Sequence, residues 1–306
     1  MGDVKIYKNI ELNNPVMIAG WPGMGSVALG VVDYLRRKIG AVKFAEITVD
    51  RLSALDSVVV KNGLASLPAT PKNTFYYRKN PDIIIFEGAL QAHGRNGIIL
   101  LNQVLTMALR LNVRRIFTGA AYPIPVSHKE EAGIYCAAND KALREFITKL
   151  DVHSMDEGHI SGLNGILLGF AGERGIGAAC LLATIPQYAI SLPSPKASAA
   201  IIKLLSRMLN FEINTMELDE FSRDMDDKMA LIEDRVKDVF IEDKAPEVPV
   251  IEKKVPPAVI EKIEKLFGEA KMDRSKASIL KRELDRWDLY KLHEDRFLDL
   301  FREGLS

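Results

Sequence analysis

The segment that most constrains the fold is residues 15–30, PVMIAGWPGMGSVALG, because a short apolar run breaks into a glycine-rich turn that leads into a helical pattern. The turn contains Gly20, Pro22, Gly23, Gly25 and Ser26. In α/β proteins a strand, a glycine turn and a helix together place free backbone N–H groups at the positive end of the helix. The segment therefore predicts an α/β fold. It leaves open whether the turn binds an anion, binds a partner's backbone, or only lets the helix pack closely on the strand.

The same turn satisfies the dinucleotide pattern G-x-G-x-x-[GA] at 23–28, and Glu46 lies near the end of the next expected strand. In that motif the first glycine follows the strand directly. Here Gly20, Trp21 and Pro22 intervene, so the phase disfavours a nucleotide cofactor. A Walker A loop is excluded because no Gly-Lys-Ser/Thr follows.

Strand-like and helix-like segments alternate along residues 15–240. This alternation predicts a mainly parallel sheet with helices on both faces. The expected strands are Val16–Ala19, Val42–Ile47, Ile83–Phe86, Arg115–Thr118, Ile134–Ala137 and Ile176–Ala183. The expected helices are Val27–Ile39, Ile98–Leu111, Asp140–Leu150, Leu163–Phe170 and Ala197–Leu209. Two further extended segments, Val58–Lys61 and Thr74–Arg78, flank Asn62-Gly63 and are expected to form a hairpin or flap.

A long amphipathic helix is predicted from Leu218 onward, with Asn214 and Thr215 as candidate caps. Its apolar residues recur at steps of three and four, in a stripe narrow enough to pair with another helix. The stripe predicts an oligomer interface. Its residues are Leu218, Phe221, Met225, Met229, Ile232 and Val236.

Four prolines fall within residues 245–257, which predicts a stiff extended linker between an α/β domain, 1–244, and a helical tail, 258–306. Residues 241–306 hold 14 Lys/Arg and 15 Asp/Glu, about twice the charge density of the preceding chain. Three short helical stripes are expected in the tail. They are Val259, Ile263, Leu266 and Phe267; Leu280, Leu284 and Trp287; and Leu292, Phe297, Leu300 and Phe301.

Further candidate ligand- or partner-binding residues lie in two other segments of the chain. Glu87, Gly88 and Gln91 come just after an apolar strand, where open α/β sheets place their ligands. Asn164, Glu173 and Arg174 lie in the glycine-rich stretch 162–177. Each of these polar residues has an equally ordinary explanation as a hydrogen-bonding or surface-turn group.

No arrangement typical of catalysis or metal binding is visible in the sequence. There is no G-x-S-x-G, no paired carboxylate motif and no Cys–His arrangement, and the five histidines show no metal-ligand spacing. Cys136 and Cys180 stand alone, which predicts neither a disulfide framework nor a metal site. We therefore expect no catalytic residue, no metal and no cofactor.

Charge and hydropathy narrow the class of partner. Lys+Arg and Asp+Glu are both 41, and a chain of zero net charge lacks the basic surplus of a nucleic-acid binder. The N-terminal residues lack the basic segment followed by an apolar segment that is typical of a signal peptide. No apolar run reaches the length that a membrane-spanning helix needs. The expectation is a cytoplasmic protein that binds neither nucleic acid nor membrane.

Three motifs together resemble the proteasome assembly chaperone 2 family, in its prokaryotic branch. They are the glycine turn 20–25 with Val27 and Gly30, the strand and turn IIIFEGALQ at 83–91, and ISGLNGILLGFAGERGIGAACLLATIPQY at 160–188. The resemblance covers roughly residues 5–240. Prokaryotic members have sometimes been labelled ATP-grasp enzymes, but this sequence shows neither the metal carboxylates nor the phosphate lysine of that class.

The resemblance implies a single α/β domain similar in topology to nucleoside phosphorylases, assembled into homo-oligomers. It also implies a role as a chaperone without catalysis. Some archaeal relatives dock on proteasome rings through a C-terminal hydrophobic-Tyr-any tripeptide, and the ending Gly304-Leu305-Ser306 does not predict that mode.

The resulting hypothesis is a non-enzymatic scaffold or assembly chaperone that forms a trimer or larger ring and contacts a protein client. The alternative is a nucleoside- or phosphate-binding protein or enzyme that uses a pocket between the Pro22–Ser26 turn, the Glu87–Gln91 turn and Asn164.

Overall fold

The structure is a computed structural model that describes residues 4–48, 58–67, 71–241, 257–273 and 276–287, together with 289, 293, 296–297 and 300; for 231–241 it describes the backbone alone. The chain divides into two compact units, Met1–Lys237 and Asp238–Ser306.

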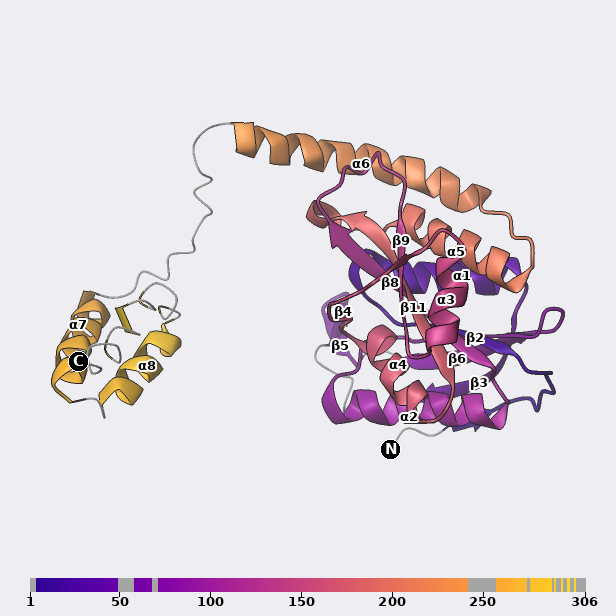
Figure 1. Cartoon of the computed structure of the whole chain (residues 1–306), viewed down its shortest axis with the longest axis horizontal. Helices are drawn as coiled ribbons and strands as arrows, with labels where there is room; N and C mark the ends of the chain where they lie inside the picture. The colour runs from indigo at the N-terminus through magenta and orange to yellow at the C-terminus, as the bar shows by residue number, and fades with distance from the viewer. Residues whose placement is uncertain are drawn as a thin grey trace. The chain divides into compact units, whose positions relative to one another are not determined.

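A nine-stranded sheet forms the centre of the first unit (Figure 1). Its strands, in order across the sheet, are β1 (Val4–Ile6), β3 (Val42–Thr48), β6 (Lys72–Arg78), β7 (Ile83–Glu87), β2 (Val16–Gly20), β8 (Arg115–Ile124), β11 (Gly177–Pro186), β9 (Ile134–Ala138) and β10 (His153–Ser154).

The sheet is mixed. Its four central strands, β7, β2, β8 and β11, run parallel, as the alternating pattern predicts. The prediction of a mainly parallel sheet is wrong at the flanks, because β6 pairs antiparallel with β7 and β9 pairs antiparallel with β11. The turn of residues 79–82 between β6 and β7 is far too short for the crossover that parallel neighbours require.

Helices cover both faces of the sheet, as expected (Figure 1). One face packs against α1 (Val27–Lys38), α3 (Lys141–Thr148) and α5 (Pro195–Leu209). The other face packs against α2 (Gly94–Arg110) and α4 (Leu163–Gly172). This two-sided cover explains the continuous apolar runs of the central strands, because both faces of those strands are buried.

The first crossover does not join neighbouring strands. The chain leaves β2, passes through α1 and returns as β3, and both β7 and β6 lie between β2 and β3. Glu46 on β3 is therefore far from the glycine turn in sheet order. Its carboxylate instead pairs with Lys43 at 2.6 Å. This placement removes the acidic partner that a dinucleotide site would need.

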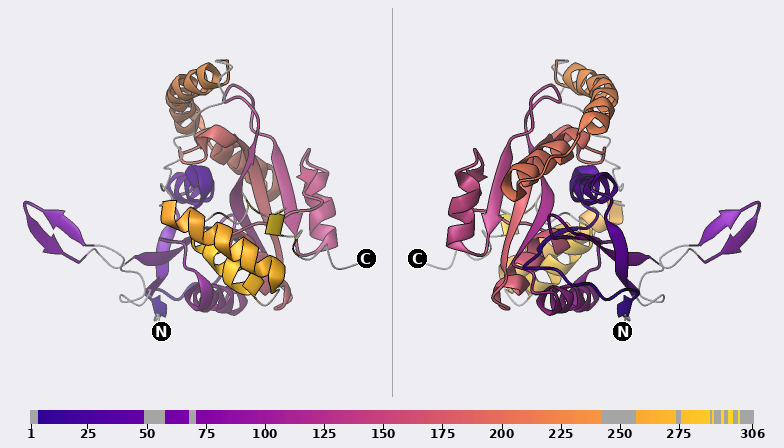
Figure 2. Two further views of the ribbon diagram at one scale, coloured as in Figure 1. Left: turned by 90° about the vertical axis from the view of Figure 1, so that its left-hand side faces the viewer. Right: turned by 90° about the vertical axis from the view of Figure 1, so that its right-hand side faces the viewer.

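Asn62 and Gly63 form the turn of a separate two-stranded hairpin made of β4 (Val59–Lys61) and β5 (Leu64–Ser66) (Figure 2). Both turn residues have positive φ, 51° and 77°, as a two-residue hairpin turn of type I′ requires. The sequence therefore places this turn correctly. Thr74–Arg78 is not part of the hairpin, because it belongs to β6 of the large sheet.

The long predicted helix is present as α6 (Met216–Ile241). The side chain of Asn214 accepts a hydrogen bond from the N–H of Met216 at 2.8 Å, so this predicted cap residue bonds the start of the helix.

In the second unit, α7 (Pro257–Met272) and α8 (Ala277–Arg286) pack around a small apolar cluster. The cluster includes Ile263, Phe267, Leu280, Leu284, Phe297 and Leu300. The predicted linker residues 245–256 lie outside the described residues, as do Leu292 and Phe301, so the domain boundaries remain a prediction.

Candidate functional site

The chain bends sharply where β2 ends. Gly20 still accepts a main-chain hydrogen bond from Gly88 at 2.8 Å, and Trp21 then turns into the core, where its ring lies 4.9 Å from Phe86. A Cβ on Gly20 would lie 2.6 Å from the carbonyl oxygen of Ala28 on α1. Gly20 therefore allows the close approach of helix and strand.

Asn164, at the start of α4, holds this bend in place. Its Oδ1 accepts from the N–H of Trp21 at 3.0 Å, and its Nδ2 donates to the carbonyl of Trp21 at 3.2 Å. The hydroxyl of Thr118 on β8 donates to the carbonyl of Asn164 at 2.8 Å. The buried amide of Asn164 thus pairs with both main-chain groups of Trp21, as a neighbouring strand would.

Gln91 makes a second connection between the same segments. Its amide nitrogen donates to the carbonyl of Pro22 at 2.5 Å, and its amide oxygen accepts from the N–H of Leu163 at 3.0 Å. The sequence-predicted residues Gln91 and Asn164 are therefore brought together with the glycine turn. In this structure their amides join segments of the protein itself.

Two of the main-chain donors of the glycine turn, those of Gly25 and Ser26, are also occupied. The short helix η1 (Met24–Ser26) is fixed by Gly25, whose N–H donates to Ile190 at 2.9 Å and whose carbonyl accepts from Ser194 at 2.7 Å. The N–H of Ser26 donates to Gly23 at 3.0 Å. Gly25 and Ser26 both have positive φ, 61° and 50°. With these N–H groups bonded inside the chain, the turn offers few free donors to an anion.

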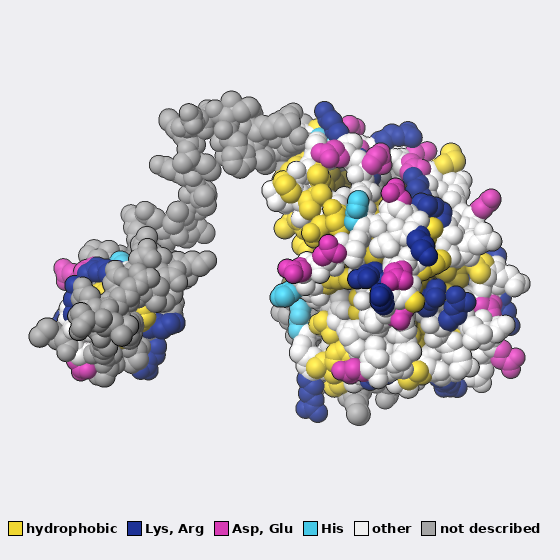
Figure 3. Space-filling model, viewed as in Figure 1, with side chains coloured by type: hydrophobic (Ala, Val, Ile, Leu, Met, Phe, Trp, Pro, Cys, Tyr) yellow, Lys and Arg dark blue, Asp and Glu magenta, His cyan; other side chains and the backbone are white. Residues whose placement is uncertain are grey.

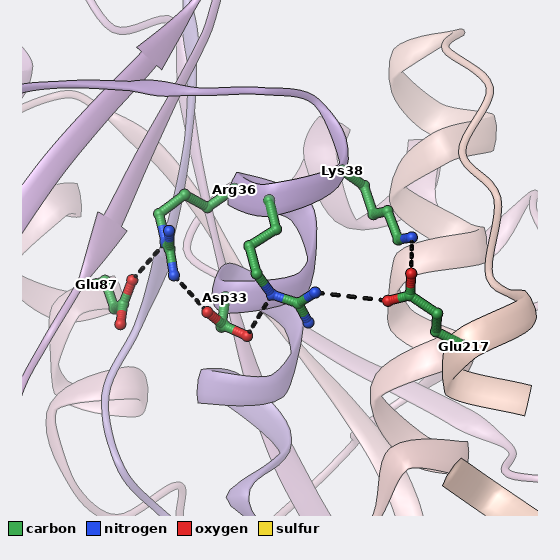
Figure 4. Close-up of polar contacts among 6 residues, drawn as sticks. Asp33, Arg36, Lys38, Glu87 and Glu217 are labelled. Carbon is green, nitrogen blue, oxygen red and sulfur yellow. Dashed lines mark hydrogen bonds and ion pairs between the residues drawn. The ribbon is translucent and has the colours of Figure 1, made fainter. Parts of the chain in front are cut away.

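Glu87 points toward Arg36 of α1 (Figure 4). It pairs with Arg36 at 2.9 Å, and Arg36 also pairs with Asp33 at 2.5 Å. Arg37 continues the network to Glu217 in the first turn of α6. Hydrogen bonds from Lys38 and Arg37 hold the pKa of the Glu217 carboxyl below its usual value. The network connects the end of β7, helix α1 and helix α6.

Gly88 serves the burial of Trp21. A Cβ at this position would lie 2.2 Å from the tryptophan ring, so any side chain would displace it. The indole Nε1 of Trp21 is buried and has no hydrogen-bond partner among the described residues. Gly88 is thus explained by packing rather than by a ligand.

Glu173 and Arg174 lie far from the glycine turn. They follow the last turn of α4, just before β11 begins, and so lie at the amino end of the parallel strands. Arg174 donates to Asn102 at 2.6 Å and to the carbonyl of Phe170 at 2.9 Å. The structure therefore separates this pair from the other candidate residues and gives Arg174 an internal role.

A cleft of roughly 240 Å³ lies at the carboxyl ends of the central strands. It is where three of the predicted positions, Gly23, Gln91 and Asn164, meet. The rest of its lining is mainly apolar: Met24, Ala28, Ala120, Ala121, Tyr122, Pro123, Met155, His159, Ile160, Ser161 and Leu182. Glu87 and Gly88 are not among the lining residues.

Two further amide side chains also hydrogen-bond main-chain groups of other segments, and the sequence analysis did not identify them. Asn73, fully buried on β6, accepts from the N–H of Ala89 at 3.0 Å. Asn139 donates to the carbonyls of Leu168 and Ile176 and accepts from the N–H of Ala178 at 2.8 Å. Asn139 lies just before a helix, where asparagine is so common as a cap or turn residue that its position gave no signal of this role. Asn73 lies within a strand and matched no motif in the sequence.

The described residues contain no group of three or more metal-ligating side chains. Both cysteines are buried and free. Burial raises the pKa of the Cys180 thiol to about 12 and also raises the pKa of Cys136. Neither thiol is therefore activated as a nucleophile.

Some residues of the apolar stripe on α6, which was predicted to form an oligomer interface, are buried within this chain instead. Leu218, Met225 and Met229 are buried against the body of the first unit, the last two with Ala189. Phe221 is 43% exposed. The side chains of Ile232 and Val236 lie outside the described part of the structure.

An ion pair also holds α6 to the body. Lys196 on α5 pairs with Asp226 at 2.9 Å and donates to the carbonyl of His128.

On the molecular face drawn in Figure 3, Lys/Arg and Asp/Glu side chains are intermingled, in keeping with the zero net charge. Within the residues that the structure describes, no helix is both long and apolar enough to span a membrane.

Comparison with known proteins gives consistent results. The chain is 26% identical over 222 residues to an uncharacterised protein of Methanocaldococcus jannaschii, covering 72% of this chain and 83% of that protein. Its fold matches PbaB of Pyrococcus furiosus, an archaeal proteasome activator, with a TM-score of 0.65 and 24% identity over 76% of this chain and 98% of that one.

Two other solved structures are similar. PbaA of Pyrococcus furiosus, an archaeal homologue of proteasome-assembly chaperone, matches with a TM-score of 0.61 and 19% identity over 77% of this chain and 94% of that one. A proteasome-assembly chaperone homologue of Mycobacterium tuberculosis matches with a TM-score of 0.60 and 18% identity, over 70% of this chain and 94% of that one. The PAC2 family itself matches residues 17–233, which is more than two thirds of the sequence, so the chain belongs to the PAC2 family.

Proposed function

We propose that this protein acts through protein contacts as an assembly chaperone or activator of a proteasome-type complex, and that it is not an enzyme. The observation that carries the proposal is the fold match to PbaB, an archaeal proteasome activator, over 98% of that chain. The polar side chains of Gln91, Asn164 and Glu87 support it as well, because they form hydrogen bonds and an ion pair within the protein.

The test is to mix the purified full chain with proteasome core particles from its own source. Co-sedimentation and the rate of hydrolysis of a fluorogenic peptide are then measured. We expect the chain to sediment with the core particle and to change the hydrolysis rate. A chaperonin ring of comparable size controls for non-specific binding. No co-sedimentation and no change in rate, with properly folded chain, would contradict the proposal.

We further propose that the chain forms a homo-oligomer of three or more copies. Apolar side chains on two elements support this. On the β4–β5 hairpin, Val60 is 61% exposed and Leu64 is 76% exposed, and on α6 Phe221 is also exposed. An isolated two-stranded hairpin is marginally stable in water, so contact with another copy would stabilise it.

Sedimentation equilibrium of the full chain and of a chain that ends at Lys244 tests this oligomer. Leu64→Lys and Phe221→Lys should lower the average mass. Thr106→Lys, which adds the same single positive charge at an exposed position of α2, should leave it unchanged. A monomeric mass for the wild type at all concentrations would refute the oligomer.

The binding of a nucleoside or phosphate is a second candidate function, and it rests on the cleft where Gly23, Gln91 and Asn164 meet. The phosphorylase-like topology that the family resemblance implies also favours it. The lining of the cleft contains no lysine or arginine, however, so a bound phosphate would lack the positive charge that usually stabilises it. A thermal-shift screen with nucleosides, nucleotides and phosphate tests this candidate, and no shift with any of them would remove its support.

A further inference from the structure

The cleft described above lies at a topological switch point of the sheet. Strands β2 and β8 are parallel neighbours, so their carboxyl ends lie at the same edge. After β2 the chain leads to β3 on one side of this pair, and after β8 it leads to β9 on the other side. Open α/β sheets bind their ligands in the crevice between two such diverging connections. Met24, just after β2, and Tyr122, near the end of β8, both line the cleft, so it occupies this crevice.

The hydrogen-bonding pattern of the sheet shows which main-chain groups of β8 face the crevice. The N–H of Val16 donates to the carbonyl of Asp82, just before β7, at 3.2 Å, so the even-numbered residues of β2 face β7 and the odd-numbered ones face β8. Through the β2–β8 register, the odd-numbered residues of β8 face β2 in turn. This pairing stops at Thr118. Beyond it, the odd-numbered residues of β8 face the crevice.

Three residues lie on this unpaired side of β8, and they are Gly119, Ala121 and Pro123. They offer three C=O groups but only one N–H, that of Ala121, because proline has no N–H and the N–H of Gly119 completes the β2–β8 ladder. The N–H of Trp21, which would bond to Gly119 if the ladder continued, donates to Asn164 instead. The edge is therefore rich in acceptors.

Ala121 is only 8% exposed, yet no group in the described part of the chain hydrogen-bonds to its N–H or C=O. Buried main-chain groups are nearly always hydrogen-bonded in proteins. Ala121 itself lines the cleft. The cleft is therefore the place from which a partner outside the chain can reach this N–H and C=O.

The walls of the cleft favour an uncharged aromatic ring. Met24 and Met155 contribute thioethers, which contact the edges of aromatic rings favourably, and Ile160 and Leu182 are apolar as well. The lining includes no aspartate, glutamate, lysine or arginine, and its one histidine, His159, is exposed. A charged group would therefore lose its hydration in the cleft without gaining a buried countercharge.

The open edge of β8 adds a requirement for hydrogen-bond donors. An amino group on an aromatic ring carries two N–H donors, which suits an edge with three C=O groups. A ring nitrogen beside that amino group can accept from the single N–H of Ala121. Adenine and cytosine carry such an exocyclic amino group.

We propose that the cleft between the ends of β2 and β8 binds an uncharged, amino-substituted aromatic heterocycle. Its amino group donates to the C=O groups of the β8 edge, a ring nitrogen accepts from the N–H of Ala121, and the two methionines contact its ring. This inference rests on the second candidate function, the binding of a small ligand in this cleft, and narrows that ligand to an uncharged amino-substituted base. It does not depend on the proteasome role.

The probe is adenosine, titrated into the full-length protein and followed by calorimetry. N6,N6-dimethyladenosine keeps the ring but lacks both amino donors, and adenosine monophosphate adds a charged group. We expect adenosine to bind and the dimethyl compound to bind about tenfold more weakly, because at least one hydrogen bond is lost. The monophosphate should bind no more tightly than adenosine.

Hydrogen exchange locates the bound ring. With adenosine at about ten times its Kd, exchange of the Ala121 amide should slow about tenfold, because binding protects this N–H in the occupied molecules. The dimethyl compound at the same concentration should protect it less.

Two matched pairs of variants place the site. Ser161→Trp fills the cleft from an exposed position of its rim and should abolish adenosine binding, whereas Thr106→Trp, at an exposed position of α2, should not change it. Met24→Trp fills the cleft from the opposite wall and replaces Ser161→Trp if that variant does not fold. Its control is Met216→Trp, at an exposed methionine of α6. Circular dichroism verifies the fold of each.

Several results would overturn the proposal. They are equal binding of adenosine and its dimethyl derivative, no binding of adenosine up to about 1 mM, or unchanged binding in folded Ser161→Trp and Met24→Trp variants. Binding of phosphate or of the monophosphate without binding of adenosine would also overturn it, while leaving small-ligand binding in place as a candidate function. Because every measurement uses isolated protein, failure here leaves the co-sedimentation result with proteasome particles unaffected.

Discussion

The side-chain amide of Asn164 forms hydrogen bonds with both main-chain groups of Trp21, a residue 143 positions earlier in the sequence. It takes the N–H that would otherwise continue the β2–β8 ladder. One buried amide therefore ends a parallel strand pair and fixes the bend that carries the chain into α1. Beyond Thr118, β8 has no paired strand on that side among the described residues.

Replacement of Asn164 by alanine should destabilise the protein by about 2–4 kcal/mol, because two buried main-chain groups of Trp21 lose their partners. The free energy of unfolding is measured by urea titration. Asn96→Ala, at an exposed position of α2, is the matched control and should change it by less than about 0.5 kcal/mol. Equal stabilities of the two variants would show that the Asn164 amide does not support the bend.

The glycines at 88 and 169 should respond oppositely to alanine. Gly88→Ala places a methyl group 2.2 Å from the buried ring of Trp21 and should cost about 1–3 kcal/mol. Gly169→Ala lies within α4 with no atom in the way, and it should stabilise by about 0.5–1 kcal/mol. Thermal unfolding measures both, and tryptophan fluorescence reports the displacement of Trp21. A neutral Gly88→Ala variant would mean that the ring can move without cost.

Stability should depend on Glu46 in a pH-dependent way. Hydrogen bonds from Lys43 and Tyr7 lower the pKa of its carboxyl, and its side chain is only 6% exposed. A carboxyl with a lowered pKa in the folded state stabilises the protein above its unfolded-state pKa and loses that contribution as the pH falls through its folded-state pKa.

The advantage of wild type over Glu46→Gln should therefore be full near pH 7 and should shrink below about pH 4.3, the reference pKa of a glutamate. Urea titrations at several pH values measure it. The exposed Glu157→Gln variant should differ little from wild type at every pH. A difference between wild type and Glu46→Gln that stays constant with pH would argue against this ionic role.

Neither cysteine should react with a thiol reagent in the native state. Burial raises the pKa of both thiols, that of Cys180 to about 12, so the reactive thiolate is scarce and shielded. Titration with Ellman's reagent should give two thiols in urea and close to none in buffer. Ser191→Cys, at an exposed position, should add one fast-reacting thiol. Rapid reaction of the native wild type would indicate that the core around β9 and β11 opens readily.

Most of the secondary structure could be predicted from local patterns. The apolar runs at 16–19, 83–86 and 176–183 are strands, and the segments expected as α1, α2, α4 and α5 are helices close to the predicted bounds. Asn62 and Gly63 identified their hairpin turn because positive φ at both turn positions favours these residue types. Such features depend on neighbours within a few residues, and the sequence displays those directly.

The roles of the polar residues required the tertiary structure. The sequence by itself determined that Glu87 and Gln91 would follow a strand of an α/β sheet and that Asn164 would lie at the start of a helix. Only the folded chain decided that the two amides hydrogen-bond to the loop after β2 and the N-terminus of α4, and that Glu87 pairs with Arg36. An amide or carboxylate bonds equally well to a ligand or to the chain's own main chain. The choice depends on segments more than fifty residues away, whose position only the packing of the whole sheet fixes.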